Sequence, residues 1–202
     1  NTYHSYLLTS SGLNLTPIIT NIGQVYTGNI GCLKSSVDGN RIVAANAESG
    51  TVDIFDFNNQ TGVLSNIMTL NNVEYPYGVE FSPNLNLLYV SEHHADSIYQ
   101  YNLLSSNISN SRTKIGVCGM AGTLQIGPDQ KIYVAGLNNS YLGVINNPNN
   151  VGLSCNYNGS GVYLSGRTSE AGLPNFHNSI YISSAGCDSV ATAIIDIKNS
   201  SS

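Results

Sequence analysis

Short apolar runs separated by polar turns follow one another along most of the chain. Within residues 79–103, an apolar run stops at Ser-Pro-Asn, resumes as Leu-Leu-Tyr-Val, passes through a charged patch and resumes as Ile-Tyr-Gln-Tyr. Runs of roughly four to eight residues bounded by turn residues are typical of β-strands. No stretch shows the period of about 3.6 residues that marks an amphipathic helix, so the pattern predicts an all-β protein.

The same arrangement of runs occurs three times. Residues 36–45, 82–91 and 127–135 each begin with a tight turn and continue as a β-rich run, at offsets of 46 and 45 residues. A short strand precedes each turn, and a third and a more variable fourth strand follow. Four short strands that recur every 40 to 50 residues or so are the sequence signature of a β-propeller blade, so residues 31–164 are predicted to form about three complete blades. Turn-stabilising side chains recur after the first strand of each repeat, at Asp38, Asn84 and Asp129.

Three complete blades leave both ends of the chain to be assigned. Residues 6–20 resemble two strands of a preceding blade, so residues 1–181 are assigned to β-propeller blades of four strands, complete and partial. Residues 182–202 are interpreted as a C-terminal strand or tail, which is either the start or the remnant of an immunoglobulin-like module. Because a propeller ring usually has more than three blades, we expect either an arc of a six- or seven-bladed ring or a smaller ring that closes tightly.

The composition limits the kinds of partner. Only 9% of the 202 residues are charged, against about 25% in an average soluble domain. The net charge is −5, and seven lysines and arginines provide no basic stripe for phosphates, so no nucleic-acid partner is expected. No apolar run approaches the roughly 20 residues of a membrane-spanning helix, so no membrane insertion is expected.

The four cysteines, Cys32, Cys118, Cys155 and Cys187, are widely spaced and include no CxxC pair, which disfavours a zinc site. Four cysteines allow three disulfide pairings, and the sequence does not choose among them. A bond between Cys118 and Cys155 conflicts with the predicted blade, because its strands place these two residues at opposite ends.

Four segments within residues 122–181 are specific enough to compare with known families. They read "GTLQIGPDQKIYVAG", "YLGVINNPNNVGLSCNY", "VYLSGRTSEAGLPNF" and "HNSIY". These segments resemble the propeller modules of large, modular cell-surface proteins of the Bacteroidetes, which are exported by the type IX secretion system. Such proteins often carry gliding-motility-associated or type B sorting C-terminal domains. The resemblance implies an extracellular location at the cell surface and implies no catalytic residues.

The most diagnostic segment, residues 166–176, closes the propeller in the family that the chain resembles. Its structural motif is carried by Gly166, Arg167, Gly172, Leu173, Pro174 and Phe176. Arg167 is expected to bond backbone carbonyl groups. The tail sequence "GCDS" is similar to a final strand in repeats of the same proteins. It overlaps Asp-Ser-Val, which resembles an O-glycosylation pattern of the Bacteroidetes and makes Ser189 a candidate modification site.

One end of the predicted blades is the expected ligand face. The loops that lead into each innermost strand and the loops that join the second and third strands share this end, because strand direction alternates. They comprise residues 71–76, 91–97, 117–121 and 136–140. The ligand-face candidates are Glu92, His93, His94 and Asp96, the only dense cluster of titratable groups. Two imidazoles flanked by carboxylates could hold a divalent metal or act as an acid/base pair, and the alternative is a solvated loop tip.

Glu80 is the second candidate because it lies on a predicted innermost strand. A carboxylate that faces a propeller channel can ligate calcium, as in gluconolactonase-like hydrolases. The repeat places Lys34 and Gln125 at the matching positions, and this variation is typical of ordinary channel lining. No metal or other cofactor is therefore expected, with calcium at Glu80 as the alternative.

The sequence lacks the motifs of several common enzyme classes. It contains no GxSxG, GxxxxGK[ST] or HExxH pattern. The leading hypothesis is therefore a non-catalytic β-propeller module of an exported bacterial surface protein, which binds a surface protein or glycan in adhesion. One alternative is a lactonase-type propeller hydrolase with a calcium ion in its channel. Another is a structural spacer or filament subunit that forms oligomers through its C-terminal strand.

Overall fold

The computed structural model describes residues 1–174 and 194–197, and strands make up nearly all of its regular structure. Three four-stranded antiparallel sheets follow one another along the chain as blades I, II and III. Blade I consists of β5 (Gly31–Ser35), β6 (Arg41–Asn46), β7 (Thr51–Asn58) and β8 (Val63–Leu70). Blade II consists of β9 (Pro76–Phe81), β10 (Leu87–Glu92), β11 (Ser97–Asn102) and β12 (Thr113–Val117). Blade III consists of β13 (Ala121–Ile126), β14 (Ile132–Gly136), β15 (Tyr141–Ile145) and β16 (Tyr157–Tyr163), so the three complete blades predicted from the repeat are confirmed.

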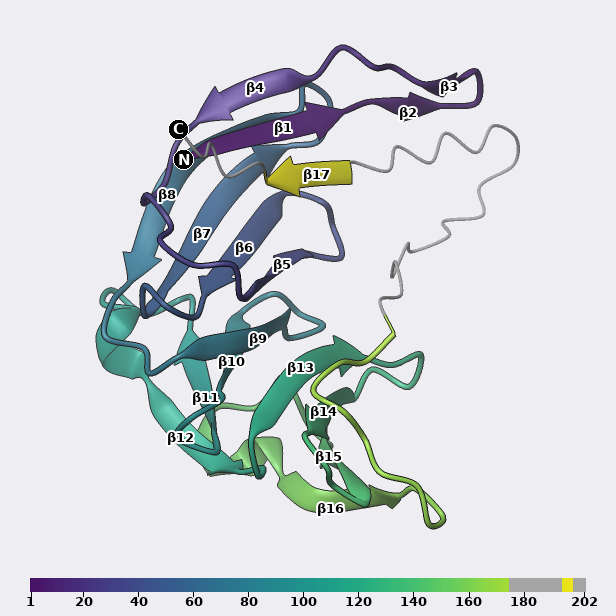
Figure 1. The fold of residues 1–202 in the computed structure, drawn as a ribbon. Coiled ribbons are helices and arrows are strands. Elements are labelled where there is room, and N and C mark those ends of the chain that lie inside the picture. The colour runs from purple at the N-terminus through teal and green to yellow at the C-terminus, as the bar shows by residue number, and fades with distance from the viewer. Residues whose placement is uncertain (175–193, 198–202) are drawn as a thin grey trace.

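A fourth sheet precedes blade I. It pairs β1 (Thr2–Tyr6) with β4 (Ile18–Asn21) and with β17 (Ile194–Ile197), so a strand from the C-terminal tail lies beside the first strand of the chain. A hairpin of β2 (Leu8–Thr9) and β3 (Gly12–Leu13) extends from β1. Figure 1 shows the four sheets fanned around a common centre, with β5, β9 and β13 nearest to it. In the part of the chain that the structure describes, the sheets form an arc.

Helical structure in the described residues is limited to two short 3₁₀ turns, Ser109–Ser111 and Gly152–Cys155. No described helix has the length and apolar character needed to span a bilayer. This composition of elements agrees with the sequence pattern, which lacks the period of an amphipathic helix.

Each blade begins with the same kind of turn between its first two strands. The side-chain oxygens of Asp38, Asn84 and Asp129 accept a hydrogen bond from the backbone N–H two residues later, at 3.1, 3.2 and 3.3 Å. The next residue in each turn has a left-handed backbone: Gly39, Leu85 and Gln130. A short polar side chain that bonds the following backbone stabilises such a turn, which confirms the structural role predicted for the three positions.

Blade II is buried on both faces because its neighbours pack against it. Along β10, Leu88 and Val90 lie in an apolar cluster shared with blade I, whereas Leu87 and Tyr89 lie in a cluster shared with blade III. The alternation follows from the two-residue period of a β-strand. Burying one such large side chain stabilises the fold by about 1.5 to 3 kcal/mol. Packing between neighbouring blades therefore fixes their relative positions.

A buried carboxylate joins the sheet of β1, β4 and β17 to blade I. Asp53 in β7 is fully buried and accepts hydrogen bonds from the hydroxyl groups of Tyr26, at 2.9 Å, and Thr69, at 2.6 Å. The Tyr26 hydroxyl also lies 2.9 Å from the hydroxyl of Tyr3 in β1. Burial raises the pKa of both tyrosines, to about 12 for Tyr3. Tyr26 belongs to the connection between β4 and β5. Because buried polar groups need hydrogen-bond partners, its bond to Asp53 holds this connection against blade I.

Candidate functional site

Hydrogen bonds link loops of blades II and III at one end of the arc. The backbone N–H of Met120 donates to the Asp96 carboxylate. The His93 ring approaches the Ala121 carbonyl oxygen through Nδ1, at 3.0 Å. These bonds join the loop between β10 and β11 to the loop that leads into β13. The structure thus brings together two of the loops that strand direction predicted to meet.

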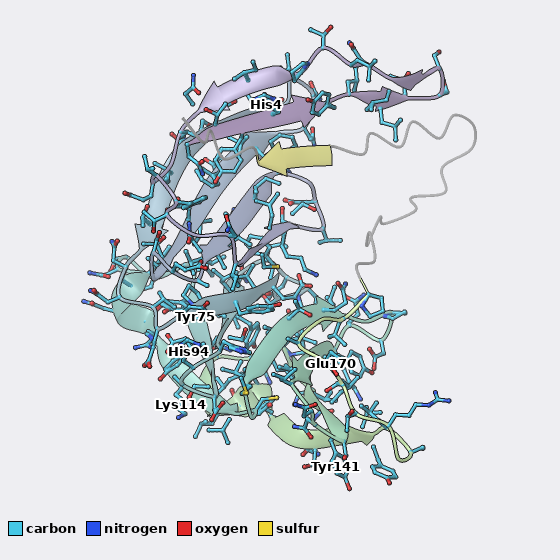
Figure 2. All side chains as sticks on the ribbon, viewed as in Figure 1. His4, Tyr75, His94, Lys114, Tyr141 and Glu170 are labelled. Carbon is cyan, nitrogen blue, oxygen red and sulfur yellow. The ribbon has the colours of Figure 1, made fainter. Side chains whose placement is uncertain are left out.

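Four rings of blade II pack together at this end, and they come from the loop before β9, the start of β9 and the loop between β10 and β11. Tyr75 stacks on His94 with ring centroids 3.9 Å apart and planes inclined by 13°, and Tyr77 stacks on His93 at 5.3 Å. The two histidine rings lie 5.7 Å apart, which joins the two stacks into one group, the aromatic cluster. His94 is exposed and the other three side chains are half-buried. Figure 2 labels Tyr75 and His94, which come from the loops on either side of β9 and β10.

The loops at this end have an unusual backbone. Five of the ten described non-glycine residues with positive φ lie in them, namely Asn72, Tyr75, Asp96, Met120 and Asn138. A left-handed backbone is uncommon for tyrosine or methionine and costs on the order of 1 kcal/mol or more. At Tyr75 the conformation is held by the His93 N–H, which donates to the Tyr75 carbonyl at 3.1 Å. The backbone conformation therefore helps to set the direction of the Tyr75 ring.

Glu92 points into the protein and does not join the aromatic cluster. Its carboxylate pairs with the guanidinium group of Arg112, which also lies 3.8 Å from the centroid of the Tyr99 ring. The same carboxylate accepts the backbone N–H of Glu74. Burial raises the pKa of Glu92, although Arg112 and the Glu74 N–H oppose this shift. Glu92 is therefore a positioning residue that ties the loop before β9 to the end of β10.

The carboxylates and imidazoles of the predicted cluster are bonded in different directions. Glu92 is engaged by Arg112, and Asp96 is engaged by the Met120 N–H. Among the described residues, no three His, Cys, Asp or Glu side chains lie together in a group that could hold a metal ion. Structural and catalytic zinc sites use about three or four protein ligands. The arrangement therefore suits contact with an organic ligand better than metal binding.

Polar atoms of the aromatic cluster remain available to a ligand. Because the Ala121 carbonyl can only accept, Nδ1 of His93 carries the hydrogen, and Nε2 is an acceptor in the neutral ring. In the part of the chain that the structure describes, the hydroxyl groups of Tyr75 and Tyr77 have no hydrogen-bond partner, and neither does the His94 ring. A ligand can therefore bond these atoms without breaking a hydrogen bond within the protein.

Sequence reasoning named the two histidines of the aromatic cluster and missed its two tyrosines. Tyr75 and Tyr77 flank Pro76, and Tyr75 belongs to a loop that strand direction had already assigned to the ligand face. Two aromatic side chains beside a proline in such a loop were the available signal. The stacking itself could not be read from the sequence, because it depends on how two separate loops of the blade fold toward each other.

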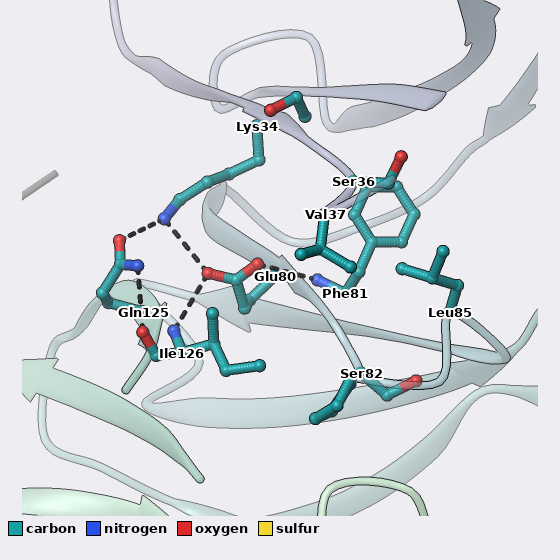
Figure 3. Close-up of a pocket in the computed structure, with 11 residues that line it drawn as sticks. Lys34, Ser36, Val37, Glu80, Phe81, Ser82, Leu85, Gln125 and Ile126 are labelled. Atoms are coloured by element: carbon teal, nitrogen blue, oxygen red, sulfur yellow. Dashed lines mark hydrogen bonds and ion pairs between the residues drawn. The ribbon is translucent and has the colours of Figure 1, made fainter. Parts of the chain in front are cut away.

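The matching positions of the three repeats meet in the channel. Lys34 Nζ lies 3.1 Å from Glu80 Oε2 and 2.6 Å from Gln125 Oε1, so each blade contributes one residue (Figure 3). The Glu80 carboxylate also accepts the backbone N–H groups of Phe81 and Ile126, both at 3.1 Å. The lysine and glutamate side chains expose only 13% and 6% of their surface. Together these residues border a cavity of about 70 Å³.

This arrangement does not fit the calcium ion considered at Glu80. Calcium takes about six to eight oxygen ligands. Among the described residues that line the cavity, Glu80 is the only carboxylate, and Lys34 balances its charge. Burial raises the pKa of Glu80 even though Lys34 opposes the shift. The interpretation as ordinary channel lining was also incomplete, because Lys34 donates to both Glu80 and Gln125 across blades.

The segment after β16 crosses blade III from its outermost toward its innermost strand. The Ser169 N–H donates to the Asn139 carbonyl at 2.8 Å, and the Leu173 N–H donates to the Thr123 hydroxyl in β13 at 2.8 Å. Arg167 bonds through its own N–H, while its side chain is exposed and donates to no described carbonyl. Within the described residues, the Arg167 side chain therefore lies in solvent and makes none of the predicted bonds to backbone carbonyl groups.

The described cysteines are free thiols. Burial raises the pKa of Cys32, Cys118 and Cys155, which lowers the share of reactive thiolate. Cys118 and Cys155 are unpaired, in agreement with the blade geometry.

Three residues named from the sequence lie outside the described residues. They are Phe176 of the structural motif, the fourth cysteine, Cys187, and the candidate modification site, Ser189.

Comparison with known proteins identifies the fold. No protein-family model matches the chain, and no curated protein matches its sequence. Virginiamycin B lyase from Staphylococcus aureus, solved as a catalytically inactive variant with quinupristin, matches with a TM-score of 0.51 and 15% identity over 77% of this chain and 55% of that chain. A protein from Lactobacillus plantarum matches with a TM-score of 0.51 and 15% identity over 71% of this chain and 44% of that chain. The fold is that of a β-propeller.

Other propeller structures match over similar ranges. The periplasmic gluconolactonase from Pseudomonas aeruginosa has a TM-score of 0.47 and 13% identity over 71% of this chain and 50% of that chain. The chain spans 36% to 55% of the length of the first structures that it matches. At these identities the likeness concerns the propeller fold alone. Function must therefore be argued from the residues of this chain.

Proposed function

We propose that the chain is a non-catalytic β-propeller module of an exported bacterial surface protein and that it binds a protein or glycan partner at its loop end. The aromatic cluster is the observation that carries this proposal. Tyrosine rings supply a large contact area with little side-chain entropy to lose, and tyrosine is enriched among the residues that dominate binding energy. The exposed His94 ring and the half-buried Tyr75 ring stacked on it are the central part of the surface.

Fixed loops support a binding role. Glu92 holds the Glu74 N–H of one loop, and Asp96 and His93 hold the backbone of the loop that leads into β13. A surface that is ordered before binding loses less conformational entropy when a ligand arrives. The rings can therefore contribute to affinity without a further cost of ordering their loops.

The use of the acidic side chains also supports a non-catalytic role. A lactonase-type site with channel calcium needs several oxygen ligands for the metal. Glu80 is instead balanced by Lys34 and bonded to backbone N–H groups. Glu92 and Asp96 are likewise bonded to protein donors. These carboxylates stabilise the structure that presents the aromatic cluster.

The spacer or filament alternative depends on a C-terminal strand that is free to pair with another copy. In the structure, β17 pairs with β1 of the same chain, from Tyr3 with Ile197 to Tyr6 with Ile194. The backbone groups on that side of β17 are therefore already bonded within the chain. This pairing favours the binding module over the filament subunit.

Binding measurements with matched variants test the proposed function. The purified chain is screened on a glycan array and against purified extracellular proteins, and each hit is quantified by biolayer interferometry. Tyr75→Ala and His94→Ala should weaken binding by about tenfold or more. Tyr163→Ala is the control, because Tyr163 is an exposed tyrosine that contacts Tyr141 on blade III instead. Equal affinity for wild type and all variants would refute the proposed surface, and calcium-dependent lactone hydrolysis would refute the non-catalytic role.

A further inference from the structure

The rings of Tyr75 and His94 stack face to face. Their planes are inclined by only 13° and their centroids lie 3.9 Å apart, so Tyr75 supports the His94 ring from one side and the exposed His94 ring keeps its outer face for a ligand. A pyranose sugar has a face made of C–H groups and an edge made of hydroxyl groups. The C–H groups carry slight positive charge and pack on the negative face of an aromatic ring. A pre-stacked and partly exposed ring pair therefore matches the apolar face of a sugar.

The polar atoms around this surface match the hydroxyl edge of a sugar. Nε2 of His93 is an acceptor in the neutral ring, and the hydroxyl groups of Tyr75 and Tyr77 both donate and accept. The nitrogen atoms of the exposed His94 ring add a further donor and acceptor. Each sugar hydroxyl donates one hydrogen bond and accepts others, so a mixed set of neutral partners suits it.

The charge around the aromatic cluster selects against acidic ligands. Glu74 and Asp96 are exposed carboxylates in the loops that carry Tyr75 and His94. Arg112 is already paired with Glu92. Neither lysine nor arginine occurs in the four loops of this end, residues 71–76, 91–97, 117–121 and 136–140. A carboxylated or sulfated ligand would meet repulsion without a compensating cation, whereas a neutral ligand would not.

The extent of the aromatic cluster favours a sugar over a protein. A standard protein interface covers about 800 Å² on each partner. The cluster consists of four rings of one blade. We infer that it is a subsite for a neutral pyranose unit of a glycan, an assignment that rests on the proposed binding function.

Calorimetric titration of the full chain tests this assignment. The probes are neutral cello-, manno- and galacto-oligosaccharides, with oligogalacturonate as an acidic counterpart of the galacto-series. At least one neutral series should bind, and the acidic probe should bind at least about tenfold more weakly. Tyr75→Ala should weaken neutral binding by about tenfold, and Tyr75→Phe, which keeps the ring and loses the hydroxyl, by only a few-fold. Tyr163→Ala should leave affinity unchanged, and thermal unfolding of each variant checks its fold.

The possible results separate the assignment from the proposed function. If a protein ligand is lost with Tyr75→Ala while no neutral sugar binds, the binding module stands and the sugar subsite is refuted. If neutral sugars bind equally to wild type and Tyr75→Ala, both the subsite and the proposed binding surface are wrong. Preference for the acidic probe would refute the charge argument, and failure of every probe would count against the subsite.

Discussion

Breaking the pair of Lys34 and Glu80 tests how the blades are joined at the channel. At 3.1 Å, the Coulomb attraction between the two charges is about 5 kcal/mol for an effective dielectric constant of about 20. Removing water from each ion costs several kcal/mol, so the pair as a whole contributes a net free energy near zero. Lys34→Met leaves a buried carboxylate without its counter-charge and should lower the free energy of unfolding by about 3 kcal/mol.

A double-mutant cycle separates the pair from the individual side chains. Glu80→Gln leaves the Lys34 ammonium buried without its counter-charge. Its single amide oxygen can accept from only one of the Phe81 and Ile126 N–H groups, which bond different carboxylate oxygens in the wild type. Each single variant should therefore be less stable than the double variant Lys34→Met/Glu80→Gln, with a coupling energy of about 3 kcal/mol or more. The free energy of unfolding is measured by urea titration. Additive effects, with coupling below about 0.5 kcal/mol, would show that the ion pair does not join the blades energetically.

The same cycle has a pH dependence of known sign. Burial holds the pKa of Glu80 above its ordinary value in the folded protein. A group with a raised folded pKa favours folding below its unfolded pKa, and this contribution is lost as pH rises through the folded pKa. Lys34→Met removes the positive charge that opposes the shift, so its destabilisation should shrink as pH falls from about 7 to about 5. A constant difference from wild type over this range would refute the assigned origin of the shift.

Three further substitutions test other parts of the structure. Asp53→Ala removes a buried acceptor shared by two hydroxyl groups and should lower the free energy of unfolding by about 2 kcal/mol, and a loss below about 0.5 kcal/mol in urea titration would contradict the network. Glu92→Gln should speed amide hydrogen exchange at Glu74 and weaken ligand binding a few-fold, and unchanged exchange would contradict its positioning role. Gly78→Ala places a methyl group against the Gly122 carbonyl of the next blade and should cost about 1 to 3 kcal/mol, and a calorimetric melting temperature equal to that of wild type would show that the blades can move apart.

The aromatic cluster shows the limit of sequence reasoning at the site. The histidines were found because they stand beside two carboxylates in one short segment. That proximity predicted convergence, whereas the structure directs Glu92 toward Arg112 and Asp96 toward Met120. Neighbouring side chains along an extended chain point to opposite sides, so density in the sequence does not mean a shared site.

The strands, the turns and the three complete blades follow from local features of the sequence. Strand periodicity and turn residues such as Asp38 act within a few residues, and the repeat copies them along the chain. The hydrogen bonds of Lys34 to Glu80 and Gln125 and the pairing of β17 with β1 depend on the tertiary structure. These contacts join segments that are distant in sequence, and they arise because packed blades converge on a common centre. No local pattern records that convergence, since it depends on the angle at which each apolar face packs on the next.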